Sequence, residues 1–157
     1  MKSIKLLLAT ALMGLGFFAK AQNISIQSPQ KLIQLKISQL PTGEINYSFD
    51  RKNKAVVLPS TFGFVLSSPD VKLKQFNIIQ IDSSEINETW QPVWGELKNV
   101  TNHCKQLALT LADKGKSGVI LKVVFRVFDD GVGFRYEFPQ QKALDYFIVK
   151  DELTQFK

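Results

Sequence analysis

Apolar and polar residues alternate with a period of two along much of the chain after residue 22. The segments 33–37 and 45–49 each place every second side chain on one face, and residues 41–44 between them have the composition of a turn. A period of two is typical of a β-strand with one buried face. No segment shows the period of about 3.6 residues that marks an amphipathic helix. The sequence therefore predicts an all-β chain.

Further short strands are predicted along the rest of the chain, at 55–58, 61–66, 76–81, 107–111, 119–128, 132–138 and 144–149. The step Asp130-Gly131 favours a two-residue hairpin turn between the two strongest of these, because both residues tolerate a positive φ. Residues 82–102 lack the alternation, so we predict a long excursion or irregular loop there. Short strands at close spacing indicate an antiparallel β-sandwich.

Residues 1–21 have the features of a secretory signal peptide. Lys2 and Lys5 precede an apolar run from Leu6 to Phe18, and Ala19-Lys20-Ala21 supplies a small-residue cleavage site. A transmembrane helix needs about 20 apolar residues, which is more than this run contains. We therefore expect residues 22–157 to be a periplasmic or secreted domain with no membrane span after cleavage.

Composition excludes several kinds of chemistry. The single Cys excludes a disulfide framework and a Cys-based zinc cluster, and the single His excludes a multi-histidine metal site within this chain. Three of the 20 basic residues lie in the signal peptide, so the net charge falls from +6 to +3 after cleavage. Nucleic-acid binding needs a basic stripe or a recognisable module, and the remaining basic residues are scattered. We expect no nucleic-acid partner.

The polar residues do not reveal a catalytic or metal site. Glycoside hydrolysis needs two carboxyl groups about 5–9.5 Å apart, and the spacing of the scattered carboxylates secures no such pair. A hairpin turn already explains Asp129 and Asp130. His103 and Cys104 are adjacent in a predicted strand, where neighbouring side chains point to opposite faces, so they are not expected to pair. The scattered carboxylates are Glu85, Glu88, Glu96 and Glu137.

Four residues are weak candidates for contact with a sugar: Trp94, Glu96, Arg126 and Arg135. The two Trp residues of the stretch 90–96 either stack on a sugar ring, plug the core or contact another domain, and composition favours packing. Arg135 shares a strand face with Glu137, so a structural ion pair or a cross-strand neighbour is expected. A sugar-hydroxyl contact is the alternative for the arginines.

Three longer stretches together resemble the N-terminal domain of glycoside hydrolase family 97. They are residues 90–96 followed by Asn102-His103, residues 125–139, and residues 58–63. The resemblance covers nearly all of residues 22–157, and 139–150 looks especially like the starch-utilisation α-glucosidases of the family. The chain departs from the family pattern at Gln106, where family members usually have glutamate, so it lacks the carboxylate at that position.

The resemblance implies a β-super-sandwich related to galactose mutarotase, followed in the family by a catalytic (β/α)8 barrel and a small β domain. Members are calcium-dependent α-glucosidases or α-galactosidases that act on α-linked oligosaccharides, with their catalytic carboxylates on the barrel. The resemblance thus implies calcium and a barrel partner for the full enzyme, and no catalytic or metal residue in this chain. Residues 22–157 are too few for a barrel of about 250 residues in addition to a sandwich. The resemblance also implies a sandwich larger than this segment, so we expect a truncated, incomplete sandwich.

Three functional hypotheses follow. The first is the N-terminal domain of a family-97-like α-glycosidase, which supports the barrel and shapes one wall of the sugar site. The second is a stand-alone carbohydrate-binding or scaffolding sandwich without enzymatic activity. The third, a mutarotase-like epimerase, ranks last, because histidines share the acid–base work in mutarotases and this chain has only His103.

Overall fold

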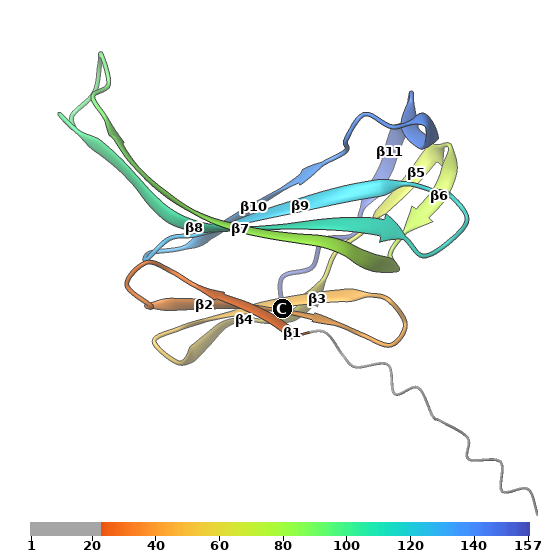
Figure 1. Cartoon of the computed structure of the whole chain (residues 1–157), viewed down its shortest axis with the longest axis horizontal. Helices are drawn as coiled ribbons and strands as arrows, with labels where there is room; N and C mark the ends of the chain where they lie inside the picture. Colours follow the sequence, from red (N-terminus) through yellow and green to blue (C-terminus); the bar gives the residue numbers. More distant parts are fainter. Residues whose placement is uncertain (1–22) are drawn as a thin grey trace, which may run out of the picture.

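Two four-stranded sheets lie face to face and a three-stranded sheet adjoins them at one end (Figure 1). This computed structural model describes residues 23–157, so the predicted signal peptide lies outside the described residues. Every strand pair in the three sheets is antiparallel. The predicted all-β, antiparallel sandwich is confirmed.

The first sheet has the order β1-β2-β3-β4, with β1 (Asn23–Gln27), β2 (Ile33–Gln39), β3 (Ile45–Arg51) and β4 (Lys54–Thr61). The predicted alternation holds in β2 and β3, whose apolar side chains are buried and whose polar ones face outward. The turn between β3 and β4 is made by Lys52 and Asn53, both with positive φ (49° and 62°). Such a left-handed pair matches the twist of the strands it joins.

The second sheet has the order β10-β9-β8-β7, with β7 (Phe76–Trp90), β8 (Val100–Asp113), β9 (Ile120–Val127) and β10 (Val132–Glu137). Leu107, Leu109 and Leu111 of β8 are buried, as the sequence predicts. In β9, Val123 and Phe125 are buried against the first sheet. The residues that alternate with them therefore lie on the outer face.

The third sheet has the order β11-β5-β6, with β5 (Phe64–Ser68), β6 (Asp70–Leu73) and β11 (Ile148–Glu152). The chain leaves the first sheet at Gly63, where an added Cβ would lie 2.4 Å from the backbone oxygen of Leu73. Only glycine fits there. The predicted continuous strand 61–66 is wrong, because β4 ends at Thr61 and β5 begins at Phe64. A single 3-10 turn, η1 (Lys142–Leu144), precedes β11, and no helix in the described part of the chain is long and apolar enough to cross a membrane.

A cluster of aromatic rings joins the two large sheets. Tyr47 of the first sheet is 1% exposed, and its ring centroid lies 6.0 Å from Phe125 and 5.5 Å from Phe134 of the second sheet. These separations are within the favourable range for aromatic pairs. The surrounding Leu, Ile and Val side chains of both sheets form one continuous core with this cluster. The aromatic cluster therefore holds the sheets in one relative position.

Residues 153–157 run beside β4 and cover part of its edge. The backbone N–H groups of Gln155 and Leu58 donate to the carbonyl oxygens of Thr61 and Lys157, each at 2.9 Å. The Tyr47 hydroxyl donates to the carbonyl oxygen of Gln155. This segment therefore ties the edge of the first sheet to the aromatic cluster.

Residues 82–102, predicted as an irregular loop, instead continue β7 and β8 as a projecting two-stranded arm. We call residues 84–104 the arm; its strands are joined by the loop 91–99. The ladder runs without a break from Ile81↔Leu109 to Trp90↔Val100. In β7 every residue from 82 to 90 except Ile86 is exposed. The prediction was wrong because a strand wetted on both faces has no apolar period to detect.

The predicted two-residue hairpin turn between β9 and β10 is confirmed, but it lies one residue earlier than the Asp130-Gly131 step. Its central residues are Asp129 and Asp130, closed by a hydrogen bond of 2.8 Å from the Phe128 N–H to the Gly131 oxygen, and the predicted positive φ is absent at Asp130 and Gly131. Asp129 is held there because its Oδ1 accepts a hydrogen bond from the backbone N–H of Gln30 at 2.9 Å. The last strand begins at Ile148, later than the predicted start at residue 144, since η1 occupies the earlier positions.

We expect the replacement Phe125→Ala to lower the free energy of unfolding by about 3–5 kcal/mol, because it opens a cavity in the aromatic cluster. The control Val56→Ala removes a side chain that is 53% exposed and should change stability by less than about 0.5 kcal/mol. Urea unfolding followed by circular dichroism measures both. A loss below about 1 kcal/mol for Phe125→Ala would contradict the role of the cluster.

Candidate functional site

The outer face of the second sheet is concave, because the arm rises at one end of it and the third sheet at the other (Figure 1). We call this surface the concave face. The register places Arg126 opposite Gly133 and Val124 opposite Arg135 on adjacent strands. Since all four positions lie on the outward side of β9 and β10, the structure brings the two predicted arginines together on one surface.

Arg135 forms the ion pair with Glu137 that the sequence predicts. Its Nε and Nη2 atoms each lie 2.7 Å from Glu137 Oε1, and Lys122 Nζ lies 3.6 Å from Oε2. The hydrogen bond from Arg135, together with the charges of Arg135 and Lys122, holds the pKa of Glu137 below its ordinary value. The carboxylate is therefore shared between two cations.

Arg126 has a neutral partner. Its Nε donates to Gln106 Oε1 at 3.1 Å, and Gln106 is the position where the resemblance led us to expect glutamate. No salt bridge to Arg126 is formed by any residue from 23 to 157. An amide oxygen satisfies one N–H group but leaves the charge of the guanidinium uncompensated. Arg126 is thus a source of positive potential on the concave face.

A small hollow lies between the two arginines. It measures about 260 Å³ and is lined by Val124, Arg126, Phe128, Gly133, Phe134 and Arg135. The hollow is open at Gly133, because a Cβ added there would meet no atom within 4 Å. The hollow combines an apolar wall, an aromatic ring and two guanidinium groups. Its chemistry suits a carboxylate or a polar ring such as a sugar.

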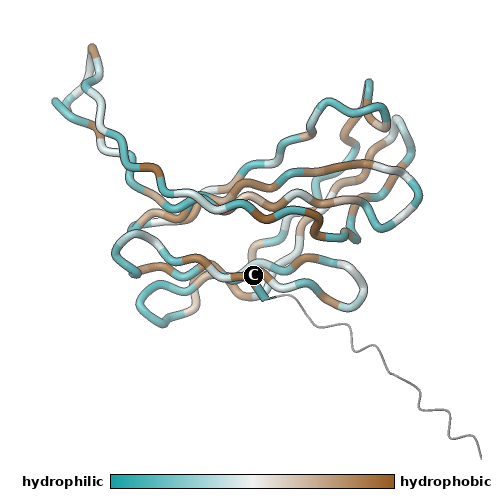
Figure 2. Tube along the Cα trace, viewed as in Figure 1, coloured by the Kyte–Doolittle hydropathy of each residue, from teal (hydrophilic) through white to brown (hydrophobic). Residues whose placement is uncertain are grey.

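Trp94 and Glu96 lie at the end of the arm, where both are exposed to solvent. Trp94 is 88% exposed, so the predicted option that it plugs the core is wrong, whereas contact with another domain or with a sugar stays a prediction. Figure 2 shows apolar positions at this far end of the arm. Six positions separate Val100 at the base of the loop from Gln106, about 20 Å of strand. The structure therefore does not bring Trp94 and Glu96 together with Arg126 and Arg135.

The remaining polar candidates hold the arm together. His103 Nε2 lies 2.8 Å from Glu85 Oε1 across the ladder, and that hydrogen bond lowers the pKa of Glu85. Asn102 Nδ2 donates to Glu88 at 2.6 Å. Cys104 is buried while His103 bonds on the opposite face, so the prediction that these neighbours do not pair is confirmed. Residues 23–157 contain no group of three His, Cys, Asp or Glu side chains that could hold a metal ion.

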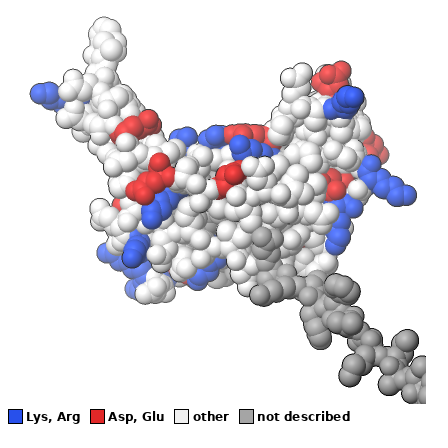
Figure 3. Space-filling view, viewed as in Figure 1, with Lys and Arg blue, Asp and Glu red and all other residues white. Residues whose placement is uncertain are grey.

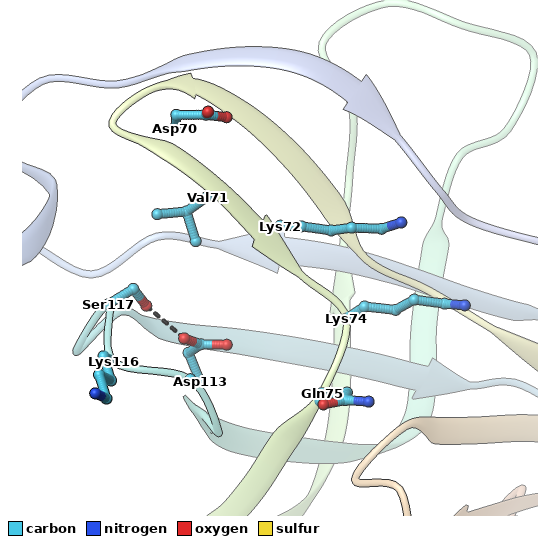
Figure 4. Close-up of a pocket in the computed structure, with 9 residues that line it drawn as sticks. Asp70, Val71, Lys72, Lys74, Gln75, Asp113, Lys116 and Ser117 are labelled. Atoms are coloured by element: carbon cyan, nitrogen blue, oxygen red, sulfur yellow. Dashed lines mark hydrogen bonds between the residues drawn. The ribbon is translucent and has the colours of Figure 1, made fainter.

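Another pocket, at the end of the sandwich near β6, lacks a convergent set of polar groups (Figure 4). The side chains of Lys72 and Lys74 extend in one direction and that of Lys116 in another (Figure 4). The Asp113 carboxylate accepts a hydrogen bond of 2.6 Å from the Ser117 hydroxyl and so stabilises its own turn. We do not assign a ligand to this pocket.

Sequence reasoning missed the arm and the hollow for different reasons. The composition of residues 91–95, with Pro92 and Gly95 at the centre of two polar stretches, was a hairpin signal that could have located the arm. The hollow depends on Phe128 and Gly133, which meet only through the β9–β10 register. No pattern in the linear sequence indicates that Phe128 and Gly133 lie close together.

The fold and the concave face define a class: a β-sandwich domain that presents a shaped, charged surface flanked by projections. The chain belongs to the glycosyl-hydrolase 97 N-terminal family, whose model matches residues 26–157. The family resemblance predicted from residues 58–63, 90–96 and 125–139 is confirmed.

Solved structures agree with this membership. A glycoside hydrolase family 97 enzyme from Pseudoalteromonas sp. strain K8 is 33% identical to this chain, with a TM-score of 0.78 in its panose complex and in its acarbose complex. The match covers 85% of this chain and 20% of that one. A β-arabinopyranosidase, 24% identical over 87% of this chain and 22% of its own, shares the fold with a TM-score of 0.75. The chain therefore spans about a fifth of the length of the solved enzymes that it matches.

We expect Glu137 to stabilise the fold in a pH-dependent way. Its pKa is lower in the folded chain than in the unfolded one, so its contribution is present above the unfolded value of about 4.3 and is lost as the pH falls through the folded value. At neutral pH, Glu137→Gln should cost at most about 1 kcal/mol, because the ion pair is partly exposed.

Urea unfolding of wild type and Glu137→Gln between pH 7 and pH 3 measures this difference. Glu96→Gln, which alters an exposed carboxylate at the end of the arm, serves as the control. If the difference in the free energy of unfolding between wild type and Glu137→Gln grew as the pH fell, the ion pair would not act as described.

Proposed function

We propose that this chain is the N-terminal domain of an exported α-glycosidase and that it supports the catalytic barrel and one wall of the sugar site. The observation that carries the proposal is the family match over residues 26–157. Likeness at 33% identity to an enzyme solved with panose and with acarbose favours an α-linked oligosaccharide as the substrate of the whole enzyme.

In this proposal the chain contributes a surface and leaves the chemistry to the barrel. Hydrolysis of a glycosidic bond needs a positioned acid and a positioned base or nucleophile. In the structure Glu137 is bound by Arg135 and Lys122, and Glu85 and Glu88 bond within the arm. In the proposal, the residues of this chain therefore orient and enclose the sugar substrate. The arginines of the concave face supply positive potential.

Calcium, implied for the full enzyme by the resemblance, does not fit the described residues of this chain. Calcium takes six to eight oxygen ligands, and residues 23–157 hold no group of three candidate side chains. Asp129 is already bonded to the backbone of Gln30. In the proposal the ion belongs to the remainder of the enzyme, and no step here runs through it.

A second candidate function is a carbohydrate-binding domain without catalysis. The exposure of Trp94 favours it, since an exposed indole ring can stack on a sugar face. The two functions differ in what the isolated chain does. A carbohydrate-binding domain retains maltooligosaccharides on its own, and this binding is lost in Trp94→Ala.

We expect purified residues 22–157 not to hydrolyse nitrophenyl α-glucoside or α-galactoside, with or without calcium, because the acid and base of the reaction lie elsewhere. A chimera in which residues 23–157 replace the corresponding N-terminal fifth of the Pseudoalteromonas enzyme should fold and hydrolyse its substrate. Turnover by the isolated chain, free of contaminating hydrolase, would contradict the proposal. So would a chimera that neither folds nor turns over substrate.

We also expect processing after Ala21 during export to the periplasm. Intact-mass analysis of the exported protein should give Gln22 as the first residue, in its free or cyclised form. Recovery of membrane-bound protein that keeps Met1 would indicate an anchor instead.

A further inference from the structure

The arm carries exposed apolar side chains at its end. Val93 is 90% exposed, Trp94 88% and Leu97 65%. Isolated surface apolar residues are ordinary, but several that lie together mark an interaction site. They occupy one nine-residue loop, 91–99, at the end of a continuous ladder. Most of the surface at this end of the molecule is uncharged in Figure 3, although a basic side chain projects from it and the loop also contains Glu96 and Lys98.

A second group of exposed apolar side chains lies at the opposite end of the concave face. We call residues 142–152, comprising η1, β11 and the connection between them, the second projection. Tyr146 is 70% exposed, Ile148 45% and Val149 44%. The arm and the second projection rise on the same side of the second sheet (Figure 1).

The floor between these two projections is charged. Lys and Arg lie there together with Asp and Glu (Figure 3). Arg126 lacks an acidic partner within residues 23–157, and the hollow beside it is open. A carboxylate from a partner would fit the hollow and compensate this guanidinium.

The outer face of the first sheet lies on the other side of the molecule, and in β2 and β3 it lacks exposed apolar side chains. The outward positions of these strands are polar, including Lys36 and Asp50. Those two side chains pair with each other. Val56 and Leu58 on β4 are exposed, and they serve below as controls. The concave face is thus flanked by apolar groups at both ends and has an unpaired cation on its floor.

We propose that the concave face and the two projections form a cradle for the catalytic remainder of the enzyme. The partner surface is apolar where it meets the ends of the cradle and places an acidic side chain in the hollow beside Arg126. The inference rests on the proposed function. The remainder of the enzyme is the occupant because the solved relatives are about five times longer than the part that this chain matches, so in them a large partner is joined to the same fold.

The chimera with the Pseudoalteromonas enzyme tests the cradle. The substitutions Trp94→Ser at the arm, Ile148→Ser at the second projection and Arg126→Glu on the floor are each made in it. Val56→Ser and Leu58→Ser are the controls for lost apolar surface, and Arg51→Glu is the control for charge reversal, since all three control positions are exposed on the first sheet. The readouts are the melting temperature and the protection of the domain junction from protease.

We expect each cradle substitution to lower the melting temperature of the chimera by about 3 °C or more and to speed cleavage at the junction at least tenfold, whereas the controls stay within about 1 °C. Trp94→Ser and Ile148→Ser should leave the melting temperature of isolated residues 22–157 unchanged, because these side chains are exposed there. This comparison separates lost docking from lost folding.

The outcomes distinguish the two proposals. An unsubstituted chimera that neither folds nor turns over substrate contradicts the proposed function and the cradle together. An active chimera in which the cradle variants behave like their controls overturns the cradle alone. So does an active chimera that is destabilised by Val56→Ser or Leu58→Ser and not by the cradle variants, because the partner would then lie on the first sheet.

Discussion

The burial of Tyr47 against Phe125 and Phe134 decides which side of each large sheet faces solvent. Side chains in a strand alternate strictly, so a shift of one residue would turn the whole apolar set outward. With Phe125 inside, Arg126 must lie outside, and with Phe134 packed on Tyr47, Arg135 must lie outside too. The aromatic core and the charged concave face are two consequences of one register.

The arm is stabilised in another way, by backbone pairing and polar side chains instead of a core. Its ladder is unbroken from Ile81 to Trp90, and the cross-strand bonds of Glu85 with His103 and Glu88 with Asn102 support it. Each exposed pair of this kind contributes little to the free energy of unfolding. The arm therefore depends on the sheet from which it grows, and it presents Trp94 at a distance that the core alone could not reach.

The sequence predicted the parts of the fold in which one strand face is buried and the other is wet. The strands around Leu35, Tyr47, Leu109 and Phe125 belong to this class, as does the pairing of Arg135 with Glu137. Alternation did not reveal the arm, because β7 is exposed at nearly every position from 82 to 90, and only the turn composition of residues 91–95 pointed to a hairpin there. Nor did it show that the apolar run 61–66 is divided between β4, which ends at Thr61, and β5, which begins at Phe64. The four sugar-contact candidates were chosen by residue type. The structure separates them into two groups, because Arg126 and Arg135 lie on adjacent strands of the second sheet, whereas Trp94 and Glu96 lie at the end of the arm.

Hydrogen exchange, read peptide by peptide, most directly tests the central claim that this domain meets its enzyme through the concave face. Residues 23–157 are compared in the isolated chain and in the chimera with the Pseudoalteromonas enzyme. We expect slower exchange in the chimera at residues 91–99, in β10 and at 146–149, with exchange in β2 and β3 unchanged. Protection confined to the first sheet, with the arm and β10 exchanging as in the isolated chain, would contradict it.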